Sequence, residues 1–101
     1  MTLEGAQLEV VHNKEASRFQ VDLGAQLAVI DYQQDNGRMV FTHTGVPPAF
    51  QGQGIAARMT EVALAYADDE GLQVIPLCSY TAAYIKRHPQ YAILTSDQRD
   101  A

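Results

Sequence analysis

Apolar and polar residues alternate along the first half of the chain with a period of two, which is typical of β-strands. The clearest segment is Arg18 to Leu23, in which Phe19, Val21 and Leu23 fall on one face. The segment Gln7 to His12 is apolar and β-branched, and it predicts an earlier strand. The chain is therefore expected to begin with strands that bury one face.

Turn signals divide the rest of this half. Gly24 marks a turn before Gln26 to Tyr32, whose run Leu27-Ala28-Val29-Ile30 is fully apolar and predicts a central strand. Asp35-Asn36-Gly37 predicts a tight hairpin, because Asn and Gly accept the positive φ angles of such turns.

The strand that returns from this hairpin is predicted over Arg38 to Thr44. If alternation continues to its end, Met39, Phe41 and His43 share one face. Strands joined by short turns in this way predict an antiparallel meander.

The second half changes to helical periodicity. A helix beginning near Gln53 is predicted by an apolar stripe at Ile55, Met59, Val62, Ala63 and Tyr66. Gly71 is expected to end it, and Asp68-Asp69-Glu70 before that glycine is read as a solvated surface.

A short buried strand, Leu72 to Leu77, follows and is expected to run parallel to the strand before the helix, since a crossover requires it. A second helix is predicted from Ser79 to about Arg87, ending before Pro89. The predicted fold is therefore α+β: a mixed sheet made of an antiparallel meander followed by strand–helix–strand–helix. We expect one domain over residues 1–101, with a core at about 7–95 and a frayed tail at 96–101.

Composition narrows the function classes. Apolar residues make up 47% of the 101 residues and charged residues 19%, which is ordinary for a globular protein. No apolar run reaches the roughly 18–20 residues of a membrane span, and the first residues lack the features of a secretory signal. The single cysteine, Cys78, allows no internal disulfide, so a cytoplasmic location is expected.

Charge and the ligand-type residues exclude further classes. The net charge of −5 disfavours nucleic acid as a partner and suits a cationic acceptor such as an amine. The histidines at 12, 43 and 88 and the cysteine at 78 show no metal-site spacing, so no metal is expected.

The segment Val46 to Ala56 joins a predicted strand to a predicted helix and carries the spacing Q-x-x-G-x-A at Gln51 to Ala56. A glycine-rich turn at this point exposes backbone N–H groups at the positive end of a helix, which suits a phosphate or pyrophosphate. A helix start that needed flexible turns is the structural alternative.

Several elements in order resemble a subgroup of very small, single-domain members of the GNAT acetyltransferase superfamily. They are His43-Thr44, Val46-Pro47, Gly52-Gln53-Gly54-Ile55-Ala56, Cys78-Ser79-Tyr80 and His88-Pro89-Gln90-Tyr91. The resemblance spans roughly Arg18 to Leu94. It implies a GNAT-like sheet that is truncated at both ends relative to full-length GNAT enzymes, and acetyl-CoA as co-substrate.

The resemblance also implies a cofactor site. Backbone N–H groups of Gln53, Gly54, Ile55 and Ala56 are expected to bind the pyrophosphate, with Gln51 and Gly52 completing the loop. Val46 is expected to contact the pantetheine arm. Lys86, Arg87 and His88 form a basic cluster that is read either as a contact for the cofactor phosphates or as an ordinary helix C-terminus.

Cys78 has two readings. A lone cysteine is commonly an inert buried residue, whereas a thiol at a helix N-terminus can have a lowered pKa. The resemblance places Cys78 in the active site, where it could accept the acetyl group before the amine does.

The resemblance suggests His43 as the general base, since imidazole titrates near neutral pH; the alternative is a histidine at the edge of the core. Tyr84 is the predicted general acid for the leaving coenzyme A thiolate, with Tyr80 as its rival. Either tyrosine could instead be a packing residue.

The predicted function is an acetyl-CoA-dependent N-acetyltransferase that acts on a primary amine. Transfer is direct with His43 as base, or it passes through acetyl-Cys78 after activation by His43. The alternative is a non-catalytic module that binds coenzyme A or another protein. A thiol-redox role for Cys78 is disfavoured because no second cysteine can resolve an oxidised thiol. The acceptor and the oligomeric state do not follow from the sequence.

Overall fold

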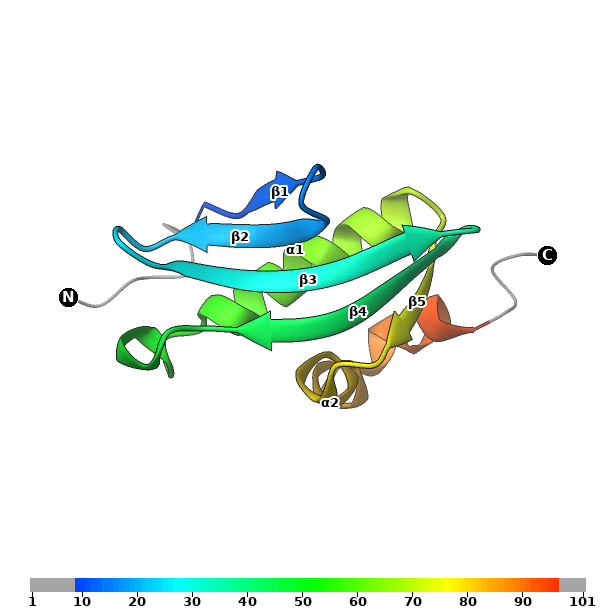
Figure 1. Cartoon of the computed structure of the whole chain (residues 1–101). Coiled ribbons are helices and arrows are strands. Elements are labelled where there is room, and N and C mark those ends of the chain that lie inside the picture. The colour runs from blue at the N-terminus through cyan, green and yellow to red at the C-terminus, as the bar shows by residue number, and fades with distance from the viewer. Residues whose placement is uncertain (1–8, 97–101) are drawn as a thin grey trace.

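The computed structural model describes residues 9–96, which form a mixed α+β fold (Figure 1). In chain order the elements are β1 (Val11–Asn13), β2 (Arg18–Asp22), β3 (Leu27–Asp35), β4 (Arg38–Gly45), the 3-10 helix η2 (Pro48–Phe50), α1 (Ile55–Asp69), β5 (Gln73–Pro76), α2 (Ser79–Arg87) and the 3-10 helix η3 (Pro89–Thr95). No helix among these residues is long and apolar enough to cross a membrane.

The sheet has the order β1-β2-β3-β4-β5. Neighbouring strands from β1 to β4 are antiparallel, whereas β5 runs parallel to β4. The predicted meander, the central position of β3 and the parallel strand after the helix are therefore confirmed. The turn between β3 and β4 has φ of 47° at Asn36 and 78° at Gly37, which confirms the predicted hairpin.

The strand boundaries differ from the predicted ones at the start of the chain. The first strand covers Val11–Asn13 instead of Gln7 to His12, and residues 7 and 8 of the predicted segment lie outside the described residues. β3 continues to Asp35, because its hairpin partner β4 extends the pairing to the turn. The predicted tail begins within the described chain at Ser96, and its last residues, 97–101, lie outside it.

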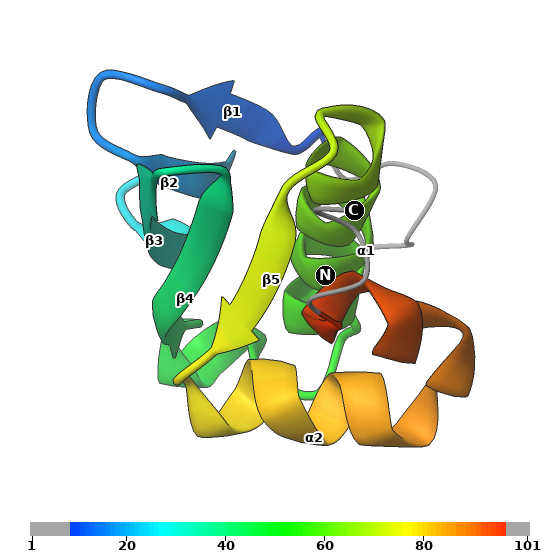
Figure 2. The same cartoon turned by 90° about the vertical axis from the view of Figure 1, so that its right-hand side faces the viewer.

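One face of the sheet packs on α1, as Figure 2 shows. The predicted apolar positions Phe19, Val21, Met39 and Phe41 are buried on this face, and Ile55, Met59 and Ala63 of the predicted helical stripe are buried against them. Within the described part of the chain, no helix covers the opposite face, which we call the open face (Figure 2). Polar residues of β2 and β3 on the open face are consequently in contact with solvent.

A β-bulge near the end of β4 overturns one expectation. Tyr32 pairs with Phe41, but Asp31 pairs with His43, so Thr42 is an extra residue on β4. The bulge reverses the alternation, and the prediction that His43 shares a face with Met39 and Phe41 is wrong. His43 is exposed on the open face, and its neighbour Thr44 turns toward the helical side.

The helices follow the predicted plan, with two short 3-10 helices, η2 and η3, in addition. α1 ends near Gly71, which has a φ of 68°, and α2 spans the predicted residues. The segment after α2, Pro89–Thr95, is a 3-10 helix that the sequence analysis did not predict. Its Leu94 is buried in the core.

Candidate active site

The two parallel strands beside the site, β4 and β5, diverge toward their C-terminal ends. β5 pairs with β4 only over residues 38–41, whereas β4 continues to Gly45. After this pairing the Cys78 N–H still donates to the Phe41 carbonyl at 2.8 Å. Beyond this point the chain of β5 turns into α2, which runs beneath the strand end (Figure 2).

A pocket of about 390 Å³ lies beside this divergence. It is bounded by the end of β4, the loop that contains η2, the start of α1 and the start of α2. Its lining residues are Thr44, Val46, Phe50, Gln51, Gly52, Gly54, Ile55, Ala56, Ala57 and Tyr80. Five residues predicted to bind the cofactor line the pocket together with Val46, namely Gln51, Gly52, Gly54, Ile55 and Ala56.

The first turn of α1 forms one wall of the pocket. Gly54 is the N-cap residue, with a φ of 83°, and the Arg58 N–H makes the first helical bond, to the Gly54 carbonyl. The N–H groups before Arg58 therefore have no acceptor within the helix. No side chain caps this end, and the first turn holds no acidic residue. The wall is suited to an anion.

The glutamines of the loop have different positions. The Gln51 side chain donates from Nε2 to the Val46 carbonyl at 3.0 Å and so closes the loop between β4 and α1. This bond gives the glutamine of the Q-x-x-G-x-A spacing a structural role. Gln53 is half-buried, and the residues that line the pocket do not include it.

Cys78 is half-buried at the N-cap of α2, and the residues that line the pocket include Thr44 and Tyr80 but not Cys78. Its Sγ lies 3.4 Å from Thr44 Oγ1. Burial raises the pKa of the thiol, but the Thr44 hydroxyl, the N–H groups of Thr81 and Tyr80 and the Thr81 hydroxyl, all of which can donate to a thiolate, lower it by more, so the net pKa is lowered. The thiol is therefore more easily ionised than an ordinary cysteine.

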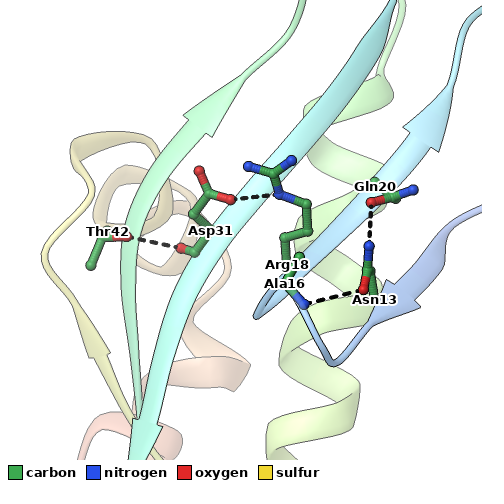
Figure 3. A network of polar contacts seen from close by, with 6 residues as sticks. All are labelled: Asn13, Ala16, Arg18, Gln20, Asp31 and Thr42. Atoms are coloured by element: carbon green, nitrogen blue, oxygen red, sulfur yellow. Dashed lines mark hydrogen bonds and ion pairs between the residues drawn. The ribbon is translucent and has the colours of Figure 1, made fainter.

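His43 lies on the other side of the sheet from Cys78, on the open face. It belongs to a row of directly paired residues across four strands, Asn13, Arg18, Asp31 and His43. In Figure 3 the Arg18 and Asp31 side chains meet in front of the strands, with Nε and Oδ1 2.9 Å apart. The Thr42 hydroxyl donates to the Asp31 carbonyl at 3.3 Å (Figure 3), which holds the bulge. His43 is thus separated from Cys78 by the sheet.

The two candidate tyrosines of α2 have different surroundings. Tyr80 lines the pocket, whereas Tyr84 is buried one helical turn further on and stacks on His88 with ring centroids 4.0 Å apart. Burial raises the pKa of both hydroxyl groups; the positive charge of Arg87 opposes this at Tyr80, and Tyr91, Glu61 and Tyr80 add to it at Tyr84. Tyr80 is therefore the tyrosine placed to reach a pocket ligand.

The basic cluster is at the far end of α2 from the pocket. Lys86 and Arg87 occupy the last turn of the helix, and the pocket contacts α2 at Tyr80. Cations are favourable at a helix C-terminus, so the structural reading explains their position. Arg58 is a basic residue nearer the pocket than this cluster, because it is the fourth residue of α1, and it forms an ion pair with Glu61.

Sequence reasoning missed several residues of the site. Strict alternation from Met39 and Phe41 assigns Thr44 to the open face, so the sequence does not predict it as a site residue. Gly45 is the signal that could have indicated the change of face, because glycine within a strand often accompanies a bulge. Phe50, Ala57 and Thr81 have no distinguishing sequence pattern. Their positions depend on how the loop and α2 pack.

The geometry agrees with comparisons to known proteins. A family model for GCN5-related N-acetyl-transferases matches residues 18–94. Protein NATD1 of Gallus gallus and of Homo sapiens are each 33% identical to this chain over 89 residues, which cover 85% of it and 81% and 79% of those proteins. An NMR structure of a GCN5-like candidate N-acetyltransferase from Staphylococcus aureus aligns with a TM-score of 0.68 and 26% identity over 86% of both chains. The chain belongs to the GCN5-related N-acetyltransferase family.

Proposed function

We propose that this protein transfers an acetyl group from acetyl-CoA to a primary amine. One observation carries the proposal: the uncapped start of α1 and the surroundings of Cys78 adjoin the same pocket. Uncapped N–H groups of α1 face a pocket at Gly54 to Ala57, and the same pocket reaches Thr44 and Tyr80, beside the ionisable thiol of Cys78. A binding site for anions next to an ionisable thiol suits a thioester substrate that carries phosphate groups.

The fit to coenzyme A rests on the chain's own donors. Gly52 and Gly54 have φ of 82° and 83°, and a Cβ built on either would meet no other atom within 4 Å, so a ligand can approach both closely. The N–H groups of Gly54, Ile55 and Ala56 would hold the pyrophosphate, with Gln53 at the edge of the loop. Val46 and the end of β4, from which β5 has diverged, would align the pantetheine arm.

In the direct route, His43 accepts a proton from the acceptor ammonium, and the amine nitrogen attacks the thioester carbonyl. The bond to the coenzyme A sulfur breaks, the Tyr80 hydroxyl gives a proton to the departing thiolate, and the second proton that the nitrogen loses restores the Tyr80 hydroxyl. The exposure of His43 on the open face supports an acceptor that approaches from that side of the sheet. We therefore assign His43 to the acceptor side, and Tyr80 in preference to Tyr84 as the acid.

In the covalent route, the Cys78 thiolate attacks the thioester, and coenzyme A leaves with a proton from Tyr80. The neutral amine then attacks acetyl-Cys78, the bond to the cysteine sulfur breaks, the sulfur departs as a thiolate, and the proton that the nitrogen loses restores the Tyr80 hydroxyl. Because the sheet separates His43 from Cys78, we propose that Thr44 and the start of α2, instead of His43, favour ionisation of the thiol.

Acetyl transfer to a panel of amines, with labelled acetyl-CoA, tests the activity. Calorimetry with coenzyme A in parallel separates an enzyme from a binding module. Turnover with at least one amine is expected, and tight binding without turnover on any amine would assign the non-catalytic alternative.

Intact-protein mass spectrometry after incubation with acetyl-CoA tests the covalent route. An acetyl adduct in the wild type that is absent from Cys78→Ser is expected if transfer passes through the thiol. Absence of an adduct, together with normal turnover by Cys78→Ser, would leave only the direct route.

A further inference from the structure

Thr81 has an unusual hydroxyl group. It is the third residue of α2, and none of its surface is exposed. Among the described residues, its Oγ1 is the one buried side-chain oxygen or nitrogen without a hydrogen-bond partner. A buried hydroxyl without a hydrogen-bond partner lowers the free energy of unfolding, so its presence at this position calls for a functional explanation.

The nearest chemistry that explains it is the thiol of Cys78, three residues earlier at the helix N-cap. As a neutral thiol, Cys78 donates its proton toward Thr44 Oγ1, at 3.4 Å. After ionisation the sulfur becomes an acceptor. Thr81 lies in the first turn of α2, three residues after the N-cap residue Cys78, so its hydroxyl is placed to donate to a thiolate there, and its effect is to lower the pKa of the thiol. The unpartnered hydroxyl would thus gain a partner when the proton leaves.

The surroundings of the sulfur support this reading. Thr44 contacts the sulfur from β4. The N–H groups of Tyr80 and Thr81 belong to the first turn of α2, directly after the N-cap residue Cys78, and the fully buried Thr81 hydroxyl belongs to the same turn. Fixed donors around a half-buried sulfur favour a negative charge on it.

We propose that Thr81 is a positioning residue that holds Cys78 as a reactive thiolate, and that Cys78 is thereby a site for electrophiles such as thioesters and haloacetamides. The inference concerns the thiolate alone. It holds whether or not acetyl transfer passes through Cys78, so its failure is distinguishable from failure of the proposed function.

The proposal predicts effects of opposite sign on folding and reactivity. Thr81→Val replaces the hydroxyl with a methyl group of similar size, which removes an unpartnered polar atom from the core. The variant should therefore unfold at an equal or higher urea concentration under mildly acidic conditions, where the thiol is protonated. The same change removes a donor to the thiolate and should reduce reactivity.

Alkylation by iodoacetamide measures reactivity at one site, because the chain has a single cysteine. We expect the pH profile of the rate to shift upward in Thr81→Val, with alkylation near neutral pH slowed roughly threefold or more, since thiolate fraction falls as pKa rises and nucleophilicity offsets only part of this. Thr81→Ser keeps the hydroxyl and should retain the wild-type profile.

Thr60→Val is the matched control. Thr60 is also a buried helical threonine, but its hydroxyl donates to the Ala56 carbonyl at 2.7 Å. Its loss should lower stability and leave alkylation unchanged. Identical alkylation profiles for wild type and Thr81→Val would overturn the proposal, as would failure of Thr81→Val to fold or a loss of stability equal to that of Thr60→Val.

Discussion

The imidazole of His43 lies against the backbone of Gly45, so that a Cβ on Gly45 would come within 3.0 Å of His43 Nε2. The backbone of Gly45 does not adopt a positive φ, so conformational freedom does not explain this glycine. The lack of room for a side chain beside the His43 ring explains it instead. At the other described glycines, an added Cβ would meet nothing within 4 Å.

Gly45→Ala should therefore displace the His43 ring. We expect stability to be unchanged or raised by about 0.4–1 kcal/mol, because alanine restricts the unfolded chain. Turnover should fall by up to about 10²-fold, since small misplacement of a catalytic group is costly. In a His43→Gln background the same change should have no effect on turnover. An equal loss in both backgrounds would show that Gly45 does not act through His43.

His43→Gln tests the base itself. Glutamine keeps a similar size but cannot take a proton, so kcat should fall by roughly 10²-fold while affinity for coenzyme A is retained. Calorimetry with coenzyme A checks that the affinity is retained. A wild-type rate in the variant would falsify the assignment.

Gly54→Val should block the proposed pyrophosphate site at the start of α1. A valine at a φ of 83° also strains the backbone, which we expect to cost about 1–3 kcal/mol. Gly71→Val is the matched control, because Gly71 flanks the other end of α1 with a φ of 68° and equally empty surroundings. Both variants should lose stability, but only Gly54→Val should lose at least about tenfold in affinity for coenzyme A, or about 1.4 kcal/mol. Equal affinities by calorimetry would reject the loop as the binding site.

Tyr80→Phe and Tyr84→Phe form a pair that separates the two candidate acids. Tyr80 lines the pocket and Tyr84 does not. We expect kcat to fall by about 10²-fold in Tyr80→Phe and to change little in Tyr84→Phe. A larger loss in Tyr84→Phe, with folding intact by circular dichroism, would return the acid role to Tyr84.

His12 should make stability depend on pH. It stacks on Phe19 with ring centroids 4.1 Å apart, and burial followed by the positive charge of Lys14 lowers its pKa from the ordinary value of 6.5. The unfolded chain therefore binds a proton at a higher pH than the folded chain does. Stability is fully present above the unfolded value and declines as pH falls from about 6.5 toward the lowered folded value.

Urea unfolding at about pH 7.5 and about pH 5.5 measures this decline, since the two conditions lie on either side of the unfolded value. We expect His12→Gln to lose less stability between them than the wild type. Lys14→Met should show an intermediate loss, because it removes the smaller of the two causes. An unaltered difference in His12→Gln would exclude His12 as its source.

Local patterns in the sequence determined most of the fold. Period-two segments such as Arg18 to Leu23 became strands, and Asn36-Gly37 became the hairpin turn, because pleat geometry and positive φ are set by neighbouring residues. The glycines of the loop, which bracket Gln53, likewise predicted a glycine turn that leads into the uncapped start of α1, because that geometry depends on consecutive backbone groups. The binding of a phosphate there stays a prediction.

Tertiary structure decided which side chains meet in the site. The bulge at Thr42 exchanged His43 for Thr44 on the helical side, because pairing with β3 accommodates one extra residue there, and period-two reasoning cannot count it. The contact of Thr44 with Cys78 joins residues 34 positions apart, and it exists because β5 leaves β4 after Phe41 and turns into α2. The choice of Tyr80 over Tyr84 as a pocket residue likewise depends on how α2 docks beneath the strand ends, which no spacing within the helix specifies.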